Sequence, residues 1–388
     1  MKRFKAYKYR IYPNKQQQEL LEKHFGCCRY IYNYALAKKI EYYTKEKKTL
    51  SRFEISKDLV SMKKRKETEW LKEVNSQSLQ ASLVNLDRAY TKFFREKSGF
   101  PKFKSKHNKQ SCQFPQRNKV DFENNRLYLM KFRKGIKCKF HRHFDGKIKT
   151  VTLSKTKTDK YFASILVEEN AIEKPKTKPD IKTSIGIDLG IKEFAVCSDG
   201  KRFGNPKHLK RSLKKLKKEQ QRLSKKKKGS NRKNKQRKKV TKIHEKIANQ
   251  RKDFLHKVSR ELIGENQINT YCLETLNVKG MMKNHCLAQS IGDVGWSMFV
   301  SFLTYKAEWE GKNILKIGRF EPSSKTCNVC GKINKDLKLS DREWVCSNCN
   351  SKHDRDFLAA CNIRDFAFDK QNLVGLDKPE STLVETAQ

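Results

Sequence analysis

Four cysteines in the C-terminal part of the chain have the spacing of a metal site. They form two Cys-x-x-Cys pairs: Cys327, Cys330, Cys346 and Cys349. Each pair brings two thiolates onto one turn, and Gly331 suits the tight turn after the first pair. The segment between the pairs, 331–345, is long enough for a hairpin that returns the second pair to the first. Because four sulfur ligands close a tetrahedral shell, we expect a structural zinc ion here.

Carboxylates follow predicted buried strands and the cysteine segment. Asp188 ends the apolar strand 184–189, and Glu274 follows the buried strand 271–273. Directly after the cysteines, Asp356 would open a helix over 357–366. Hydrolysis of a phosphodiester by two Mg²⁺ ions requires such hard oxygen ligands. The sequence therefore predicts a magnesium-dependent nuclease site at these three acids, with Asp354 as the alternative third acid.

Each of these residues, taken alone, also has a simpler interpretation. Asp188 could be a turn aspartate and Glu274 a surface carboxylate, while Asp354 or Asp356 could cap the helix. Their order, spacing and positions at strand ends together favour the catalytic interpretation. His353 is a rival zinc ligand, but with four thiolates available we expect it near the acids or on a phosphate.

The charge balance points to a polyanionic partner. The chain has 388 residues, and its 89 Lys and Arg against 42 Asp and Glu give a formal net charge of +47. A folded chain with that charge repels itself unless a polyanion neutralises it, so nucleic acid is the expected partner. A ribosomal-type binder and a membrane-surface protein are the simpler alternatives. No apolar run approaches the roughly 20 residues of a membrane span. We expect a cytoplasmic, nucleoid-associated protein without a membrane partner.

In the reducing cytoplasm that we expect for this protein, paired cysteines bind metal more often than they form disulfides. The remaining eight cysteines show no ligand spacing and are predicted to be small buried hydrophobic residues. They are Cys27, Cys28, Cys112, Cys138, Cys197, Cys272, Cys286 and Cys361.

Hydrophobic patterning divides the chain into segments of different kinds. Residues 7–11 alternate as a half-buried strand, and leucines and aromatics recur at helical spacing over 79–93. Short alternating strands follow between 120 and 168, which together with the first strand suggest a small barrel with a helical insertion. The basic segment 201–260 predicts a helical hairpin with its tip near Gly229, and a charge run so one-sided favours contact with a nucleic-acid backbone over a merely solvated face.

Several longer motifs resemble the TnpB family, the OrfB transposases of small insertion sequences, which are relatives of the type V CRISPR effector nucleases. The resemblance extends from residue 7 to about residue 366. The matching segments are 7–13, 186–192, 249–257, 276–282, 305–309, 322–327 and 353–356.

The resemblance implies a multidomain α+β and α/β protein. Its parts would be an N-terminal wedge-like β-barrel with a helical recognition insertion, a RuvC-like nuclease domain of RNase H type, and an inserted zinc ribbon. In the N-terminal part, the expected bounds are 1–12 and 110–170 for the barrel and 13–109 for the insertion, followed by a linker at 171–182. The nuclease domain is expected at 183–320 and 353–368, with basic helices at 201–260. The ribbon is expected at 321–352, and a disordered tail at 369–388.

The family's activity is implied in the same way. Its members use a transposon-encoded guide RNA to find double-stranded DNA beside a short flanking motif, and they cut it. By position, Asp188, Glu274 and Asp356 become the magnesium-binding acids and the four cysteines the zinc ligands. We expect a monomer on its RNA.

One position departs from the family pattern. An asparagine that would hydrogen-bond near the last acid is replaced by Leu358. Because all three acids remain, we expect an active nuclease. The alternative is an RNA-guided repressor or transposition accessory protein that binds without cutting. A transposase that joins strands by itself is weaker, because no separate end-binding module is apparent.

Overall fold

The computed structural model describes all residues except 1, 97, 108, 171–173, 339 and 374–388. The chain forms two compact units, Met1–Ile172 and Glu173–Gln388. Each unit has its own hydrophobic core and is described by itself. No helix in the described part of the chain is both long and apolar enough to cross a membrane.

The first unit is built on a seven-stranded antiparallel sheet with the strand order β2-β6-β7-β1-β5-β4-β3. The strands are β1 (Lys2–Tyr12), β2 (Gln110–Phe114), β3 (Lys119–Asp121), β4 (Arg126–Leu129), β5 (Phe132–Lys139), β6 (Lys147–Lys155) and β7 (Tyr161–Asn170). The alternation predicted at 7–11 is confirmed, since Tyr7, Tyr9 and Ile11 are buried. Among the described ladders none joins β2 to β3, so closure of the sheet into a barrel stays a prediction.

Helices occupy most of residues 15–95, between β1 and β2. They are α1 (Lys15–Glu46), α2 (Arg52–Lys64), the 3-10 helix η1 (Lys66–Glu73) and α3 (Ser76–Arg95). Asn14 and Ser51 begin α1 and α2 with capping boxes, which satisfy backbone N–H groups at the helix starts. The apolar stripe predicted over 79–93 includes the buried face of α3, where Leu79, Leu83 and Leu86 pack into the core of this unit.

The second unit contains a five-stranded sheet with the order β10-β9-β8-β11-β12. Its strands are β8 (Ser184–Asp188), β9 (Glu193–Cys197), β10 (Arg202–Gly204), β11 (Thr270–Glu274) and β12 (Asn313–Ile317). The central strands β8, β11 and β12 are parallel, whereas β9 and β10 pair antiparallel. Strand β10 lies at the start of the range 201–260 in which basic helices were expected, so the helical part begins later, at His208. The three residues of β10 alternate too briefly to stand out beside a lysine-rich run.

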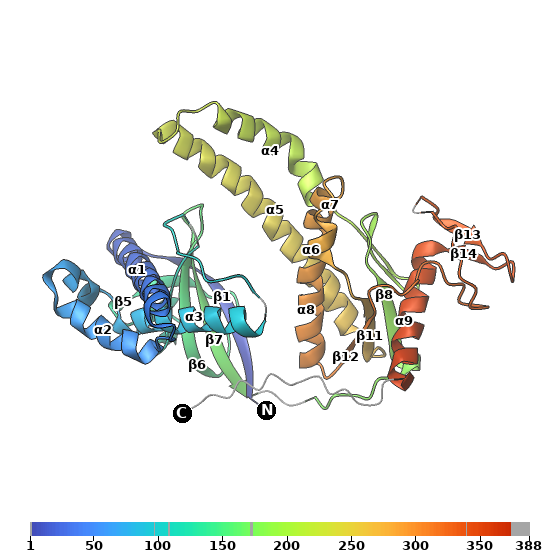
Figure 1. Ribbon diagram of the computed structural model, residues 1–388, viewed down its shortest axis with the longest axis horizontal. Coiled ribbons are helices and arrows are strands. Elements are labelled where there is room, and N and C mark those ends of the chain that lie inside the picture. The colour runs from blue at the N-terminus through green and yellow to red at the C-terminus, as the bar shows by residue number, and fades with distance from the viewer. Residues whose placement is uncertain (1, 97, 108, 171–173, 339, 374–388) are drawn as a thin grey trace. The chain divides into compact units, whose positions relative to one another are not determined.

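Helices cover both faces of this sheet, which explains why its central strands are apolar on both sides. Tyr271 and Leu273 pack in the core formed with α5 (Asn231–Gly264) and α8 (Trp296–Trp309). The intervening Cys272 packs instead with Ile363 of α9 (Arg355–Leu373). Figure 1 shows α9 along the other side of the sheet from α8. Since α9 continues to residue 373, the predicted tail is helical at its start, and 374–388 lie outside the described residues.

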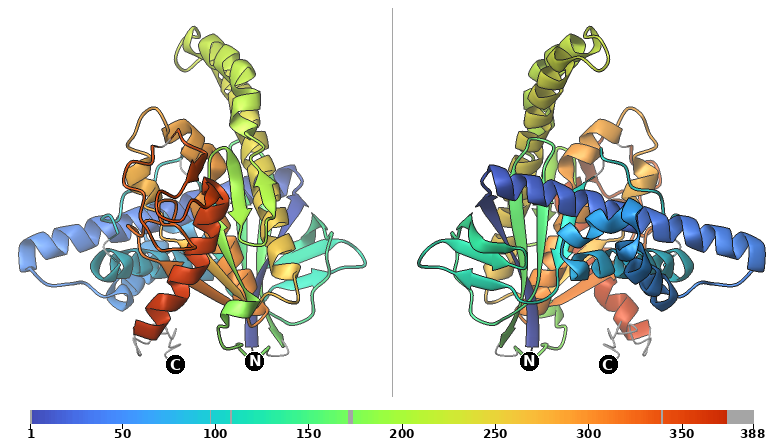
Figure 2. Two further views of the ribbon diagram at one scale, coloured as in Figure 1. Left: turned by 90° about the vertical axis from the view of Figure 1, so that its right-hand side faces the viewer. Right: turned by 90° about the vertical axis from the view of Figure 1, so that its left-hand side faces the viewer.

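The predicted basic hairpin is confirmed as α4 (His208–Ser224) and α5, with Ser230 capping α5 after the tip at Gly229. Figures 1 and 2 show the two helices side by side, extending away from the sheet. At the base of the hairpin, Arg251 donates to the Asp293 carboxylate at 2.9 Å and the same carboxylate accepts from the Leu209 N–H at 2.8 Å. These bonds fix α4 and α5 to the end of α7 (Ala288–Val294).

Candidate metal centres

Two of the three predicted acids lie at one edge of the sheet. Strands β8 and β11 are parallel neighbours, and Ile187 pairs with Leu273. Asp188 and Glu274 are the next residues, so both follow the last pair of the β8–β11 ladder and are the last residues of their strands. The parallel register therefore brings together two carboxylates from segments far apart in the sequence.

Helix α9 brings the third acid to the same edge. Asp356 lies in the first turn of α9, which packs on β8. The contact is so close at Gly186 that a Cβ atom there would lie 1.9 Å from the carbonyl oxygen of Ala360. Only glycine permits this approach of helix backbone to strand. Gly186 thus sets the distance between the start of α9 and the end of β8.

The electrostatics of Asp188 show that the three carboxylates share one neighbourhood. Burial and, after it, the negative charges of Glu274 and Asp356 together raise the pKa of Asp188 to about 7, while Arg355 acts in the opposite direction. Like charges held close together favour protonation of one of them. A divalent cation relieves the same repulsion, and carboxylate oxygens are the ligands that Mg²⁺ prefers. The donor set fits magnesium.

Neighbouring side chains already engage two of these acids. The Ser323 hydroxyl donates to Glu274 Oε1 at 2.5 Å, and Arg342 Nη1 lies 3.4 Å from both carboxylate oxygens of Asp356. Within the described ranges, the acids do not form a group whose ligand atoms all lie within 4.8 Å of one another. Their charges nevertheless act on one another, since Glu274 and Asp356 both raise the pKa of Asp188, and Arg342 partly neutralises Asp356.

Asp354 has a different environment. It lies in β14 (Lys352–Asp354), accepts the backbone N–H of Phe357 at 2.9 Å, and forms an ion pair with Arg202 at 3.1 Å. These contacts, led by the N–H bond from Phe357 and the bond from Arg202, hold the pKa of Asp354 below its usual value despite partial burial. It behaves as the cap of α9, one of the two roles that the sequence left open.

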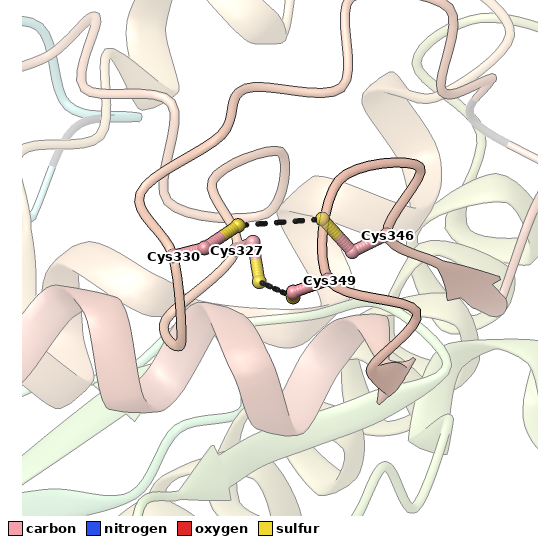
Figure 3. Close-up of side chains that lie close together, drawn as sticks. All are labelled: Cys327, Cys330, Cys346 and Cys349. Atoms are coloured by element: carbon pink, nitrogen blue, oxygen red, sulfur yellow. Dashed lines mark hydrogen bonds between the residues drawn. The ribbon is translucent and has the colours of Figure 1, made fainter.

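The four paired cysteines meet as predicted. Their sulfur atoms all lie within 4.8 Å of one another (Figure 3). Cys327 Sγ is 3.6 Å from Cys349 Sγ, and Cys330 Sγ is 3.5 Å from Cys346 Sγ. A tetrahedral zinc ion with bonds of about 2.3 Å requires sulfur separations of about 3.8 Å. The cluster therefore fits zinc with little rearrangement.

Two similar turns hold these sulfurs in place. Gly331 N–H donates to Cys327 O and Asn350 N–H donates to Cys346 O, each at 2.9 Å. Both residues have a positive φ, 74° at Gly331 and 57° at Asn350. Hydrogen bonds from the Asn348 side chain and the Lys332 backbone lower the pKa of Cys330 to about 6. A thiol ionised near neutral pH is prepared to bind a metal.

His353 corrects a prediction. Instead of facing the acids, it lies in β14 with Nε2 3.1 Å from Cys327 Sγ and its ring 4.8 Å from that of Trp344. Pairing of β14 with β13 (Glu343–Val345) turns the His353 side chain toward the cysteine cluster. The pairing also shows that the ribbon continues to residue 354, past the predicted boundary at 352.

Leu358 likewise has a structural role. It is 2% exposed and packs with Cys327, Leu337 and Trp344 in the small core of the ribbon. The replacement of asparagine by leucine therefore contributes apolar area between α9 and the ribbon.

Of the eight other cysteines, Cys286 is exposed, which corrects its predicted burial, and the other seven are buried.

Replacement of Gly186 by alanine should displace α9. The added Cβ would overlap backbone atoms, which cannot move aside as a flexible side chain can. We expect the free energy of unfolding of the second unit to fall by about 2 kcal/mol or more, as for an overpacked core. Denaturant titration followed by circular dichroism measures this change.

Gly204→Ala is the matched control, because a Cβ at Gly204 in β10 meets nothing within 4 Å. An equal stability of the Gly186→Ala and Gly204→Ala variants would contradict the close approach of α9 to β8.

Comparisons with known proteins agree with this architecture. Three family models match the chain: "Probable transposase" of the OrfB_IS605 family over 164–285, "Cas12f1-like, TNB domain" over 296–363, and a helix-turn-helix domain over 1–48. The last description differs from the structure, in which the described residues 2–48 hold strand β1 and one helix, α1.

Two curated relatives match nearly the whole chain. "Putative RNA-guided DNA endonuclease" of Streptomyces pristinaespiralis is 37% identical, over 92% of this chain and 88% of the relative. "Putative RNA-guided DNA endonuclease InsQ" of Escherichia coli K12 is 32% identical, over 94% of this chain and 92% of the relative.

A solved structure, "Cryo-EM structure of the Cas12f1-sgRNA-target DNA complex", is similar with a TM-score of 0.57 and 16% identity. The similarity covers 94% of this chain and 99% of that one. It places the chain in the class of proteins with the mixed α/β fold of Cas12f1. The two curated relatives are more specific, and they show that the chain belongs to the OrfB/TnpB family of IS605-type elements.

Proposed function

We propose that this protein is an RNA-guided DNA endonuclease of a transposable element, which hydrolyses phosphodiester bonds at Asp188, Glu274 and Asp356 beside a short flanking motif. The observation that carries the catalytic part is the placement of Asp188 and Glu274 at the ends of neighbouring parallel strands, with Asp356 in the first turn of the helix that packs on β8. The raised pKa of Asp188, caused by burial and then by the charges of Glu274 and Asp356, agrees with this placement. The relatives named as RNA-guided DNA endonucleases support the guided part.

The three acids would hold magnesium, which supplies an activated water and stabilises charge on the attacking and leaving oxygens. Asp188 and Glu274, fixed by the sheet register, set one side of the site, and Asp356 approaches on α9. The contacts of Asp354 with Phe357 and Arg202 favour Asp356 as the third acid. Zinc at the four thiolates would be structural, because four sulfur ligands leave no open position.

Guide RNA and double-stranded DNA are the partners that the charge distribution supports. The exposed lysines and arginines of α4 and α5 offer a long basic surface with few acids, suited to phosphates in any sequence. Sequence would then be read by base pairing with the guide, as in other RNA-guided nucleases, while the protein grips the backbone. We assign wedge and recognition roles to the first unit, and expect a monomer on the RNA.

The test is to purify the chain with RNA co-expressed from its own element and to offer DNA that matches the guide. We expect cleavage with Mg²⁺, loss of cleavage with EDTA, and loss when the DNA match is scrambled. Equal binding of matched DNA without scission in Mg²⁺ or Mn²⁺ would instead establish the non-cutting binder. Strand joining without RNA would establish the transposase.

Divalent metal binding should depend on pH through Asp188. Because the pKa of Asp188 is raised to about 7, the group is mostly protonated at pH 6 and mostly ionised at pH 8. Only the ionised form binds metal, so affinity should rise about tenfold over this interval. Titration of the full-length protein with Mn²⁺, with free Mn²⁺ followed by electron paramagnetic resonance, measures the affinity.

The same pKa shift has the opposite effect on metal-free stability. Between pH 3.8 and about 7 the folded chain holds a proton at Asp188 that the unfolded chain has lost, so this contribution to stability falls as the pH rises through that window. Asp188→Asn removes the titrating group and serves as the control for the pH dependence of stability.

A wild-type Mn²⁺ affinity that stays constant from pH 6 to pH 8 would contradict the assignment of Asp188 as a metal ligand with a raised pKa.

A further inference from the structure

A serine outside the three acids contacts one of them directly. Ser323 lies in the loop between β12 and the first zinc turn, is 5% exposed, and donates its hydroxyl to Glu274 Oε1 at 2.5 Å. An ionised carboxylate has two oxygens, each of which can accept more than one bond, so this bond to Oε1 leaves Oε2 for another ligand. It also restricts the rotamer of a side chain that is otherwise flexible.

The loop that carries Ser323 is itself held by α9. Asn362 is 2% exposed, and its amide nitrogen donates to Ser323 O at 2.6 Å and to Thr326 O at 2.7 Å. Both hydrogens of the amide group are thereby used on two carbonyls of one loop. Thr326 Oγ1 closes the loop by donating to Pro322 O at 2.9 Å.

The same loop leads without interruption into the cysteine cluster. Cys327 follows Thr326, is fully buried, and belongs to the four-thiolate group. One continuous set of contacts thus connects Cys327 with Glu274 through Thr326, Asn362 and Ser323. Any displacement of the first zinc turn would move the carbonyl that Asn362 holds, and with it the Ser323 hydroxyl.

We propose that Ser323 is a positioning residue for Glu274, and that Asn362 and the zinc turn together fix Ser323, so that the zinc ribbon sets the geometry of the magnesium-binding acids. This inference rests on the proposed function. Residues that orient a metal ligand in this way typically change metal affinity by 10- to 100-fold when they are removed.

The first test is the Ser323→Ala variant of the full-length protein. We expect its Mn²⁺ affinity to fall by about 10-fold or more, and the Mg²⁺ concentration for half-maximal DNA cleavage to rise similarly. Zinc content and thermal midpoint should match the wild type, which separates positioning from a folding defect. Ser323→Thr keeps the hydroxyl and should recover much of the affinity. Ser301→Ala is the matched control, since the Ser301 hydroxyl on α8 donates within its own helix to Ser297 O at 2.9 Å.

Asn362→Leu tests the link to the ribbon. If Asn362 acts through Ser323, combining Asn362→Leu with Ser323→Ala should weaken Mn²⁺ binding no more than the stronger single change does. Wild-type Mn²⁺ affinity and Mg²⁺ dependence in Ser323→Ala would overturn the inference while leaving the proposed function intact. Failure of the proposed function would appear separately, as wild-type cleavage that survives Asp188→Ala.

Discussion

Replacing Asp188 by alanine should abolish DNA cleavage while leaving RNA and DNA binding intact. Asp188 ends β8 beside Glu274, at the edge where the two parallel strands end. Removal of a metal-binding acid eliminates the charge that holds the cation, so we expect the rate to fall by about 1000-fold or more. Cleavage of guide-matched DNA by the complex purified with its RNA measures the rate, and gel-shift titration measures the binding.

Asp253→Ala is the matched control for this variant. Asp253 is an exposed aspartate on α5 whose carboxylate pairs with Lys257 at 2.8 Å, within the same helix. Its removal changes the net charge as Asp188→Ala does, so a pure charge effect would appear in both. Unchanged cleavage in Asp188→Ala would show that the assigned acids are not the catalytic site.

Replacing Cys330 by serine should release zinc and destabilise the ribbon. Four thiolates converge in the wild type, and serine is a much poorer zinc ligand than a thiolate. Zinc content should fall from about one ion per chain to nearly none. Because metal binding and folding are coupled in such small modules, the ribbon should also become sensitive to proteolysis. Elemental analysis and limited proteolysis between residues 321 and 354 are the measurements.

Cys286→Ser is the control for loss of a thiol, because Cys286 is exposed and lies outside the four-cysteine group. It should retain zinc and resist proteolysis as the wild type does. Well-folded wild-type protein without zinc would contradict the assignment of the cluster.

The features that could be predicted from the sequence are those in which local pattern and chemistry coincide. Cys-x-x-Cys spacing determines its own turn, so the cluster of four thiolates was recognisable without a fold. Asp188 and Glu274 each end an apolar run of strand length, and two buried parallel strands end at a common edge. The hairpin tip at Gly229 was recognisable because Gly229 and Ser230 interrupt a basic run in which leucines recur at near-helical spacing from Leu209 to Leu223.

Other features depend on contacts between residues far apart in the sequence, which local sequence patterns do not indicate. Ser323 is 49 residues from Glu274, and Asn362 is 39 residues from Ser323, so neither contact has a spacing signature. The side of β14 on which His353 lies follows from its register with β13. The packing of Leu358 against the ribbon likewise depends on tertiary contacts, so the sequence showed only a departure from the family pattern at this position. These are the residues through which α9 connects the ribbon to the acids.

The most direct test of the account is to locate the metal. Crystals of the complex with guide RNA and DNA, prepared with Mn²⁺, should show anomalous scattering between the carboxylates of Asp188, Glu274 and Asp356, and a separate zinc signal among the four cysteines. Manganese bound elsewhere, with any of the three carboxylates directed away from it, would contradict the central claim that these acids form one cation site.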